Sequence, residues 1–137
     1  MANPITKNLA TGTIGELLVQ LRLLQHGVQS APPLKDSGND LIALKGYQVR
    51  AIQVKTSRNA IPRAKNLPEC YHLLALVMLI GNEEDLLLDD TQIYLIPKSD
   101  VATLRWTKKN LTPYILTPQH VGSLFSRDAL IEPGRAQ

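Results

Sequence analysis

One β-hairpin pattern constrains the fold of this chain more than any other part of the sequence. Two segments with apolar side chains, residues 40–45 and 48–56, are joined by a short turn near Gly46. In the second segment, Ile52 and Val54 alternate with polar residues. Alternation of this kind is typical of a strand with one face on a core. The sequence therefore predicts a hairpin whose Ile52 and Val54 side chains point into the core.

The polar side of this hairpin carries three groups that can work together. A two-residue turn at Gly46-Tyr47 places Leu44 opposite Val49 and therefore Asp40 opposite Gln53, whereas a turn at Lys45-Gly46 makes Ala51 the partner of Asp40. Any turn of even length leaves Asp40, Gln53 and Lys55 on one face, because side chains alternate along a strand. Directly opposed residues have Cβ atoms about 4.5–5.5 Å apart. Two oxygens at that separation can bind one magnesium ion, so the pattern predicts a cation site beside a lysine.

A helix is predicted upstream of the hairpin, between a capping box formed by Thr13 and Glu16 and a terminating Gly27. Its main apolar stripe recurs at helical spacing, with a second apolar side opposite. The stripe comprises Ile14, Leu17, Leu18, Leu21 and Leu24, and the second side Val19 and Leu23. We expect one of these sides to meet the sheet and the other to meet a further helix or a partner subunit.

The order of the remaining elements predicts an α/β fold with a mixed sheet, as a single domain over residues 1–137. The most apolar segment, residues 71–80, is expected to be a strand buried on both faces. Further strands are predicted at 28–31, 92–96 and, as an edge strand, 112–116. A short helix is expected from Ser99, and a C-terminal helix capped by Thr117 and Pro118 is expected to reach about residue 125.

Composition excludes several classes of protein. A single cysteine, Cys70, excludes an internal disulfide and a thiolate metal cluster, and the three histidines lack zinc-ligand spacing. The N-terminus has no apolar core of a secretory signal, and the longest apolar run, residues 73–80, is too short to span a bilayer. We therefore expect a soluble, cytoplasmic protein without a small-molecule cofactor. A formal charge of +3 permits binding of a polyanion but does not require it.

These residues resemble the PD-(D/E)XK nuclease superfamily, whose fold is a restriction-endonuclease-like mixed sheet flanked by helices. Asp40 matches the acid that begins one hairpin strand, Lys55 the lysine of the next, and Glu16 the glutamate of an upstream helix. Two positions depart from the pattern, since Asn39 replaces a common proline and Gln53 replaces the acid of acid-x-Lys. The stretch from residue 11 to 58 is similar to small Gln-x-Lys members, among them intron-encoded homing endonucleases, and four-way-junction resolvases have a similar layout.

The resemblance implies magnesium-dependent hydrolysis of DNA phosphodiester bonds, with manganese able to substitute, and products with 5′-phosphate and 3′-hydroxyl ends. Asp40, Gln53 and Glu16 would bind the metal, and Lys55 would orient a water or offset charge on the phosphate. These four residues are the predicted catalytic set. A domain this small would recognise DNA as a homodimer or homotetramer, with the side of the helix that carries Val19 and Leu23 as a candidate interface.

DNA contacts are predicted next to this set. The residues that follow the second hairpin strand include three cations, Arg58, Arg63 and Lys65, and the hydroxyl group of Ser57. Such cations would contact backbone phosphates, although the same residues are equally compatible with a solvated loop.

Several alternatives remain open at this stage. The capping box by itself accounts for Glu16, and Asp36 competes with Asp40 for the role of the hairpin acid. The protein could instead cleave junctions or flaps. Because Gln53 contributes no charge, the chain could also be a DNA-binding module with a decayed site. A structural or interaction domain that ignores DNA is the third alternative.

Overall fold

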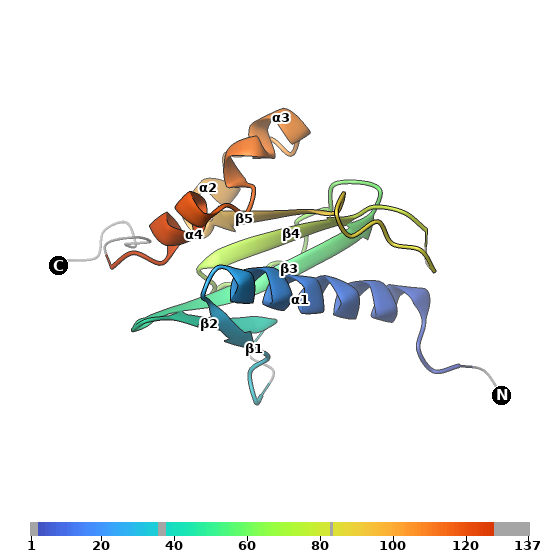
Figure 1. Cartoon of the computed structure of the whole chain (residues 1–137), viewed down its shortest axis with the longest axis horizontal. Helices are drawn as coiled ribbons and strands as arrows, with labels where there is room; N and C mark the ends of the chain where they lie inside the picture. The colour runs from blue at the N-terminus through green and yellow to red at the C-terminus, as the bar shows by residue number, and fades with distance from the viewer. Residues whose placement is uncertain (1–2, 36–37, 83, 128–137) are drawn as a thin grey trace.

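The computed structural model describes residues 3–35, 38–82 and 84–127 and contains one five-stranded mixed sheet with strand order β1-β2-β3-β4-β5. Only β3 and β4 are parallel. The strands are β1 (Gln29–Ala31), β2 (Leu41–Lys45), β3 (Gln48–Arg58), β4 (Leu73–Leu79) and β5 (Gln92–Pro97). The helices are α1 (Lys7–Gln25), α2 (Lys98–Val101), α3 (Lys108–Leu111), the 3₁₀-helix η1 (Thr112–Tyr114) and α4 (Pro118–Leu124) (Figure 1). The predicted α/β fold is confirmed. Among the described helices, none combines the length and the apolar character that a membrane-spanning segment needs.

Of the two predicted turn positions, the structure has Gly46-Tyr47, because Leu44 pairs with Val49 across the turn between β2 and β3. Gly46 has φ of 60° in this turn, a conformation that glycine adopts without strain. The pairing of β2 with β3 ends at Leu41 and Ile52, whereas β4 follows β3 as far as Arg58. Within the described residues, β3 therefore has a strand on one side only from residue 53 to 58. We call this segment the free edge of β3.

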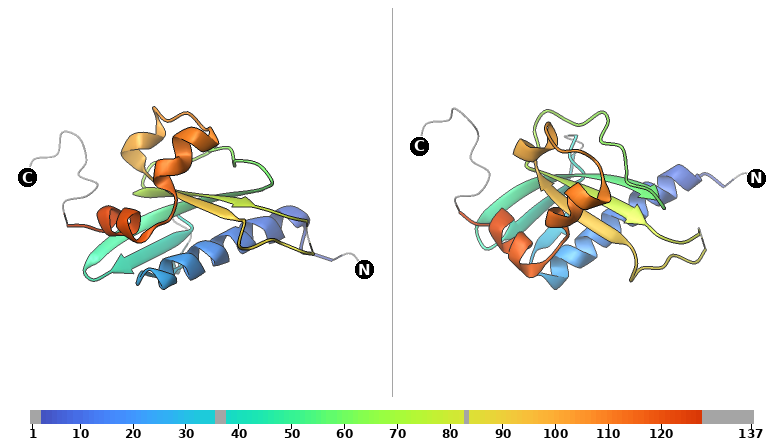
Figure 2. Two further views of the ribbon diagram at one scale, coloured as in Figure 1. Left: turned by 45° about the horizontal axis from the view of Figure 1, so that its top comes forward. Right: turned by 90° about the horizontal axis from the view of Figure 1, so that it is seen from above.

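Each face of the sheet carries its own apolar cluster. Ile52 and Val54 belong to the cluster that contains residues of α1 and α4, so their predicted inward orientation is confirmed. The other cluster packs residues of α3 and η1 and apolar side chains of the segment 59–72 against β4 and β5. This segment carries the chain from β3 to the parallel β4, and it passes over the face away from α1 (Figure 2). Within it, an irregular connection replaces the helix that usually makes such a crossover.

The helix α1 differs from the prediction in both its start and its buried side. It begins at Lys7, with the Thr6 hydroxyl accepting from the Leu9 N–H at 3.3 Å, so the predicted capping box of Thr13 and Glu16 is wrong. Both of these residues lie inside the helix. The capping box is a pattern of helix starts, and here the helix already includes the six residues before Thr13.

The predicted interface of α1 is also wrong, because Val19 and Leu23 are completely buried in the core. Three leucines of the predicted main stripe, Leu17, Leu21 and Leu24, are 50–62% exposed. Gly15 explains this choice of side: together with Val19 and Leu23 it forms the buried row, and its lack of a side chain lets the helix approach β3 closely. Fit against the sheet, and not the number of leucines, selects the buried side.

Of the other predicted elements, some are confirmed and one is wrong. The fully buried strand at 71–80 is confirmed as β4, and Thr117 caps α4 through its hydroxyl as expected. The predicted edge strand at 112–116 is wrong, since residues 112–114 form η1 and Ile115 makes only an isolated bridge to Tyr94. Pro113 favours this outcome because it lacks the N–H that a strand ladder needs. Asp36, the competing acid, lies outside the described residues.

Candidate active site

Asp40 lies directly before β2, at the point where the free edge of β3 begins. Its backbone N–H donates to the Ile52 carbonyl at 3.1 Å, and its Oδ2 accepts the Val54 N–H at 2.8 Å. The carboxylate thus takes the place that a backbone carbonyl would occupy if β2 continued. This hydrogen bond fixes the acid beside Val54 and leaves its other oxygen for a further partner.

Glu16 meets Asp40 from α1. Burial raises the pKa of the Glu16 carboxyl, and the negative charge of Asp40 and a side-chain hydrogen bond with Asp40 raise this pKa further. The helix reaches this position because Gly15 lies against Thr56, and a Cβ on Gly15 would be only 1.8 Å from the Thr56 hydroxyl oxygen. With no capping role, Glu16 is a half-buried acid beside a second acid, an arrangement that a cation would stabilise.

Gln53 is the most enclosed of the predicted site residues, with 8% of its surface exposed. Its side-chain oxygen Oε1 is buried and has no hydrogen-bond partner. A buried polar atom without a protein partner is costly, so a water molecule or an ion is expected to satisfy it. Gln53 neighbours Asp40 across the hairpin, one step beyond the Leu41–Ile52 pair.

Asn39 contributes to this enclosure. Its side-chain Nδ2 donates to the Cys70 carbonyl at 2.8 Å. Asn39 lies on the β2 side of β3 and Cys70 precedes β4, so the bond joins segments on opposite sides of the middle strand. Asn39 Oδ1 is a second buried oxygen without a partner. The residue that replaces the common proline therefore helps to close the site.

Hard divalent cations such as magnesium prefer oxygen ligands, and this donor set fits one. Two carboxyl groups, from Glu16 and Asp40, are in contact, and Gln53, whose amide oxygen has no partner, follows the Leu41–Ile52 pair on the neighbouring strand. In the described residues no group of three or more His, Cys, Asp or Glu side chains is placed to hold a metal ion. The site is thus poor in charge, as the neutral Gln53 predicts, and a phosphate oxygen or water would have to complete the coordination.

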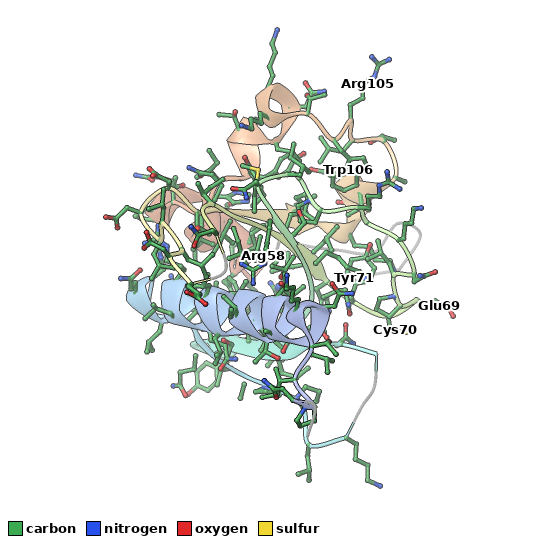
Figure 3. The ribbon with its side chains drawn as sticks, turned by 90° about the vertical axis from the view of Figure 1, so that its right-hand side faces the viewer. Arg58, Glu69, Cys70, Tyr71, Arg105 and Trp106 are labelled. Carbon is green, nitrogen blue, oxygen red and sulfur yellow. The ribbon has the colours of Figure 1, made fainter. Side chains whose placement is uncertain are left out.

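The predicted basic residues lie on both faces of β3 and on the crossover that follows it. Lys55 is half-buried and shares the side of Gln53, while Arg58 points toward α1, where its Nε donates to the Thr11 hydroxyl at 3.1 Å. Figure 3 shows Arg58 beside α1. The Ser57 hydroxyl donates to the Ala60 carbonyl and shapes the turn after β3. The other two cations, Arg63 and Lys65, are exposed on the irregular crossover.

The sequence did not reveal the uncharged residues that position the acids of the site. Gly15 and Thr56 set the distance between α1 and β3, and Asn39 fixes the segment before Asp40. The only signal for Gly15 is a glycine within a leucine-rich helix, immediately before the acid. Thr56 and Asn39 give no such signal because they are ordinary strand-end and turn residues.

The fold is similar to that of a bacterial homing endonuclease of known structure. That protein is I-Ssp6803I; the superposition has a TM-score of 0.50 and a sequence identity of 16%, and covers 80% of this chain and 86% of that one. No protein-family model matches the sequence, and no curated protein matches it. At this identity the likeness shows a shared fold: a mixed sheet with flanking helices.

The Glu16–Asp40 contact predicts how stability depends on pH. Because the pKa of Glu16 is higher in the folded than in the unfolded protein, the free energy of unfolding falls as pH rises from the ordinary value of 4.5 through the raised pKa. Glu16→Gln cannot ionise. Without divalent cations, we expect this variant to melt at a higher temperature than the wild type at neutral pH, and the difference to shrink below 4.5.

Thermal unfolding followed by circular dichroism measures this effect. Asp89→Asn is the matched control, because it removes one carboxylate from an exposed position. The control should melt like the wild type at both pH values. A wild type more stable than Glu16→Gln at neutral pH without cations would contradict the proposed strain between the two acids.

Proposed function

We propose that this protein is a metal-dependent endonuclease that hydrolyses DNA phosphodiester bonds. The observation that carries the proposal is the contact between Glu16 and Asp40 at the start of the free edge of β3, where Gln53 also has a side-chain oxygen without a partner. Asp40 has a structural role as acceptor of the Val54 N–H, but this role requires neither a second acid nor an unpartnered amide oxygen. The fold shared with a homing endonuclease supports the same class of activity.

Magnesium, or manganese in its place, would be held by Asp40, Gln53 and Glu16. Such an ion polarises a phosphoryl oxygen and acidifies a water molecule. The chain's own part is to hold the acids in fixed positions: Val54 anchors Asp40, and α1 brings Glu16 to it. Lys55, on the side of Gln53, offsets negative charge that develops on the phosphate.

DNA is the proposed substrate because a duplex can lie along the free edge of β3, where cations occur on both faces of the strand. Arg58 lies on the α1 side and Lys55 on the other, with Arg63 and Lys65 exposed on the crossover above it. We further propose that the protein binds DNA as a homodimer or homotetramer. The exposed leucines of α1 provide an apolar surface for the contact between copies, in place of the buried side predicted from sequence.

The proposal is tested by incubating the protein with supercoiled plasmid and with an immobile four-way junction, each with magnesium, manganese or a chelator. We expect nicked and linear products with either ion and none with the chelator. DNA binding without cleavage under every condition would leave only a decayed binding module. Cleavage that persists in the chelator would exclude the metal site. Neither binding nor cleavage would favour an interaction domain.

A further inference from the structure

A cleft of about 700 Å³ opens where the parallel strands β3 and β4 end, separate from the contact between Glu16 and Asp40. Its lining contains the last residue of β3 and residues of the two turns that follow the strands. These residues are Arg58, Asn59, Gly81, Asn82 and Glu84. Only Arg58 among them belongs to the predicted site. Glu84 belongs to the connection between β4 and β5, which is rich in acidic residues.

The floor of the cleft is fixed by a reciprocal pair of hydrogen bonds. Asn59 Nδ2 donates to the Gly81 carbonyl, and the Gly81 N–H donates to Asn59 Oδ1, both at 3.0 Å. Asn59 has φ of 56° and Gly81 has φ of 108°, and a Cβ on Gly81 would lie 2.5 Å from the Asp85 carbonyl oxygen. Both turns are thus locked together, so the cleft exists before any ligand arrives.

Arg58 lines this cleft and has hydrogen-bond donors without an acceptor. Its Nε donates to the Thr11 hydroxyl at 3.1 Å, which orients the guanidinium group against α1. Its Nη1 is buried and has no hydrogen-bond partner. A guanidinium group carries five N–H donors in a fixed fork, and that fork fits paired acceptors. The ligand of this cleft should therefore offer two acceptors side by side.

The other polar groups of the cleft indicate whether its ligand is a phosphate or a base. A phosphate offers acceptors only, and the carboxylate of Glu84 on the same lining would repel it. A base edge offers both acceptors and donors. Guanine presents O6 and N7 together as acceptors for an arginine fork. Donors for Glu84 come from N4 of a paired cytosine, or from N1 and N2 of the same guanine if it is unpaired.

We propose that this cleft binds a guanine base of the DNA, so that Arg58 and Glu84 make the nuclease sequence-selective. The proposal rests on the endonuclease function proposed above and deepens it by naming a feature of the substrate. Arg58 lies three residues beyond Lys55 along β3. At about 3.3 Å per residue this is a distance of about 10 Å, or about three base steps of about 3.4 Å. Because Lys55 and Arg58 point to opposite faces of β3, the guanine should lie about three nucleotides or more from the cleaved bond.

A randomised DNA library, bound by the wild-type protein in calcium and sequenced, tests this proposal. We expect guanine enrichment of about 10-fold at one position per bound protomer, lost in Arg58→Ala at that position alone. Glu84→Gln, an exposed substitution that should not affect folding, should weaken the same preference. Lys65→Ala is the control: it should lower affinity for all sequences equally and reduce the salt dependence of binding.

Modified bases then show whether the bound guanine is paired or unpaired. Replacing the selected guanine with 7-deazaguanine, which lacks N7, should weaken binding in either case. Replacing it with inosine, which lacks the N2 amine, should weaken binding only if the base is unpaired. A uniform loss of affinity in Arg58→Ala would make Arg58 a phosphate contact and overturn the proposal. So would cleavage without a guanine preference, although the nuclease function would stand. A wild-type protein that neither binds nor cuts DNA would contradict both the guanine cleft and the nuclease function.

Discussion

Asp40→Asn should lower magnesium-dependent DNA cleavage by about 100-fold or more while the protein stays folded. The substitution removes the negative charge that a divalent cation needs, and even residues that only orient metal ligands cost about 10–100-fold when changed. The asparagine oxygen can still accept the Val54 N–H, which Asp40 accepts at 2.8 Å. Cleavage rates over a magnesium titration, with unfolding curves of both proteins, measure the two effects separately.

The choice of asparagine matters because Asp40→Ala would also leave the Val54 N–H without its partner. That loss costs about 1 kcal/mol or more of unfolding free energy and would mix stability with activity. Lys55→Ala should also lower the rate, by about 100- to 1000-fold, without changing the metal concentration at half-maximal rate. Lys45→Ala, which removes a lysine from the far end of the hairpin, should cleave normally. Normal cleavage by Asp40→Asn would show that the site is elsewhere.

Gly15→Ala is expected to destabilise the protein by about 1–3 kcal/mol, although alanine is the better helix former. The added Cβ would lie 1.8 Å from the Thr56 hydroxyl oxygen and 2.8 Å from Thr56 Cβ. Rotation of the threonine moves its oxygen but not its Cβ, so α1 itself must shift. Because Glu16 is the next residue, cleavage should fall as well, even under conditions where the variant is fully folded.

Gly12→Ala is the matched control one turn earlier in α1. A Cβ at Gly12 would meet no atom within 4 Å, so this variant should gain about 0.5–1 kcal/mol from helix propensity and cleave normally. Chemical denaturation of the two variants beside the wild type gives both values. If Gly15→Ala proves as stable as Gly12→Ala, close contact between α1 and β3 does not position Glu16.

The local features of the hairpin could be predicted from sequence because they follow from alternation alone. A fixed period of two determines which residues share a face, and the turn at Gly46 determines the register of Leu44 with Val49. A local pattern also predicted α4, because Thr117 and Pro118 are residues typical of a helix start. In each case the signal and the structure it determines lie close together in the chain.

The features that sequence reasoning missed depend on contacts between distant segments. The buried side of α1 is chosen by the fit of Gly15 against Thr56, which lie in different elements, and a count of leucines favours the other side. The start of α1 was missed because a capping box can also occur inside a longer helix. That error affected the site: the cap explained Glu16 without Asp40, and the true helix start removes this explanation.

The free edge of β3 also bears on the solubility of the protein. An unpaired strand edge is a template onto which another chain can add a strand, and natural proteins prevent this with charged side chains. From residue 53 to 58, Lys55 and Arg58 supply that charge, and the Asp40 carboxylate occupies the Val54 N–H. The residues proposed to bind metal and DNA are thus also those that discourage intermolecular strand pairing. Neutralising all three together should lead to aggregation as well as loss of cleavage.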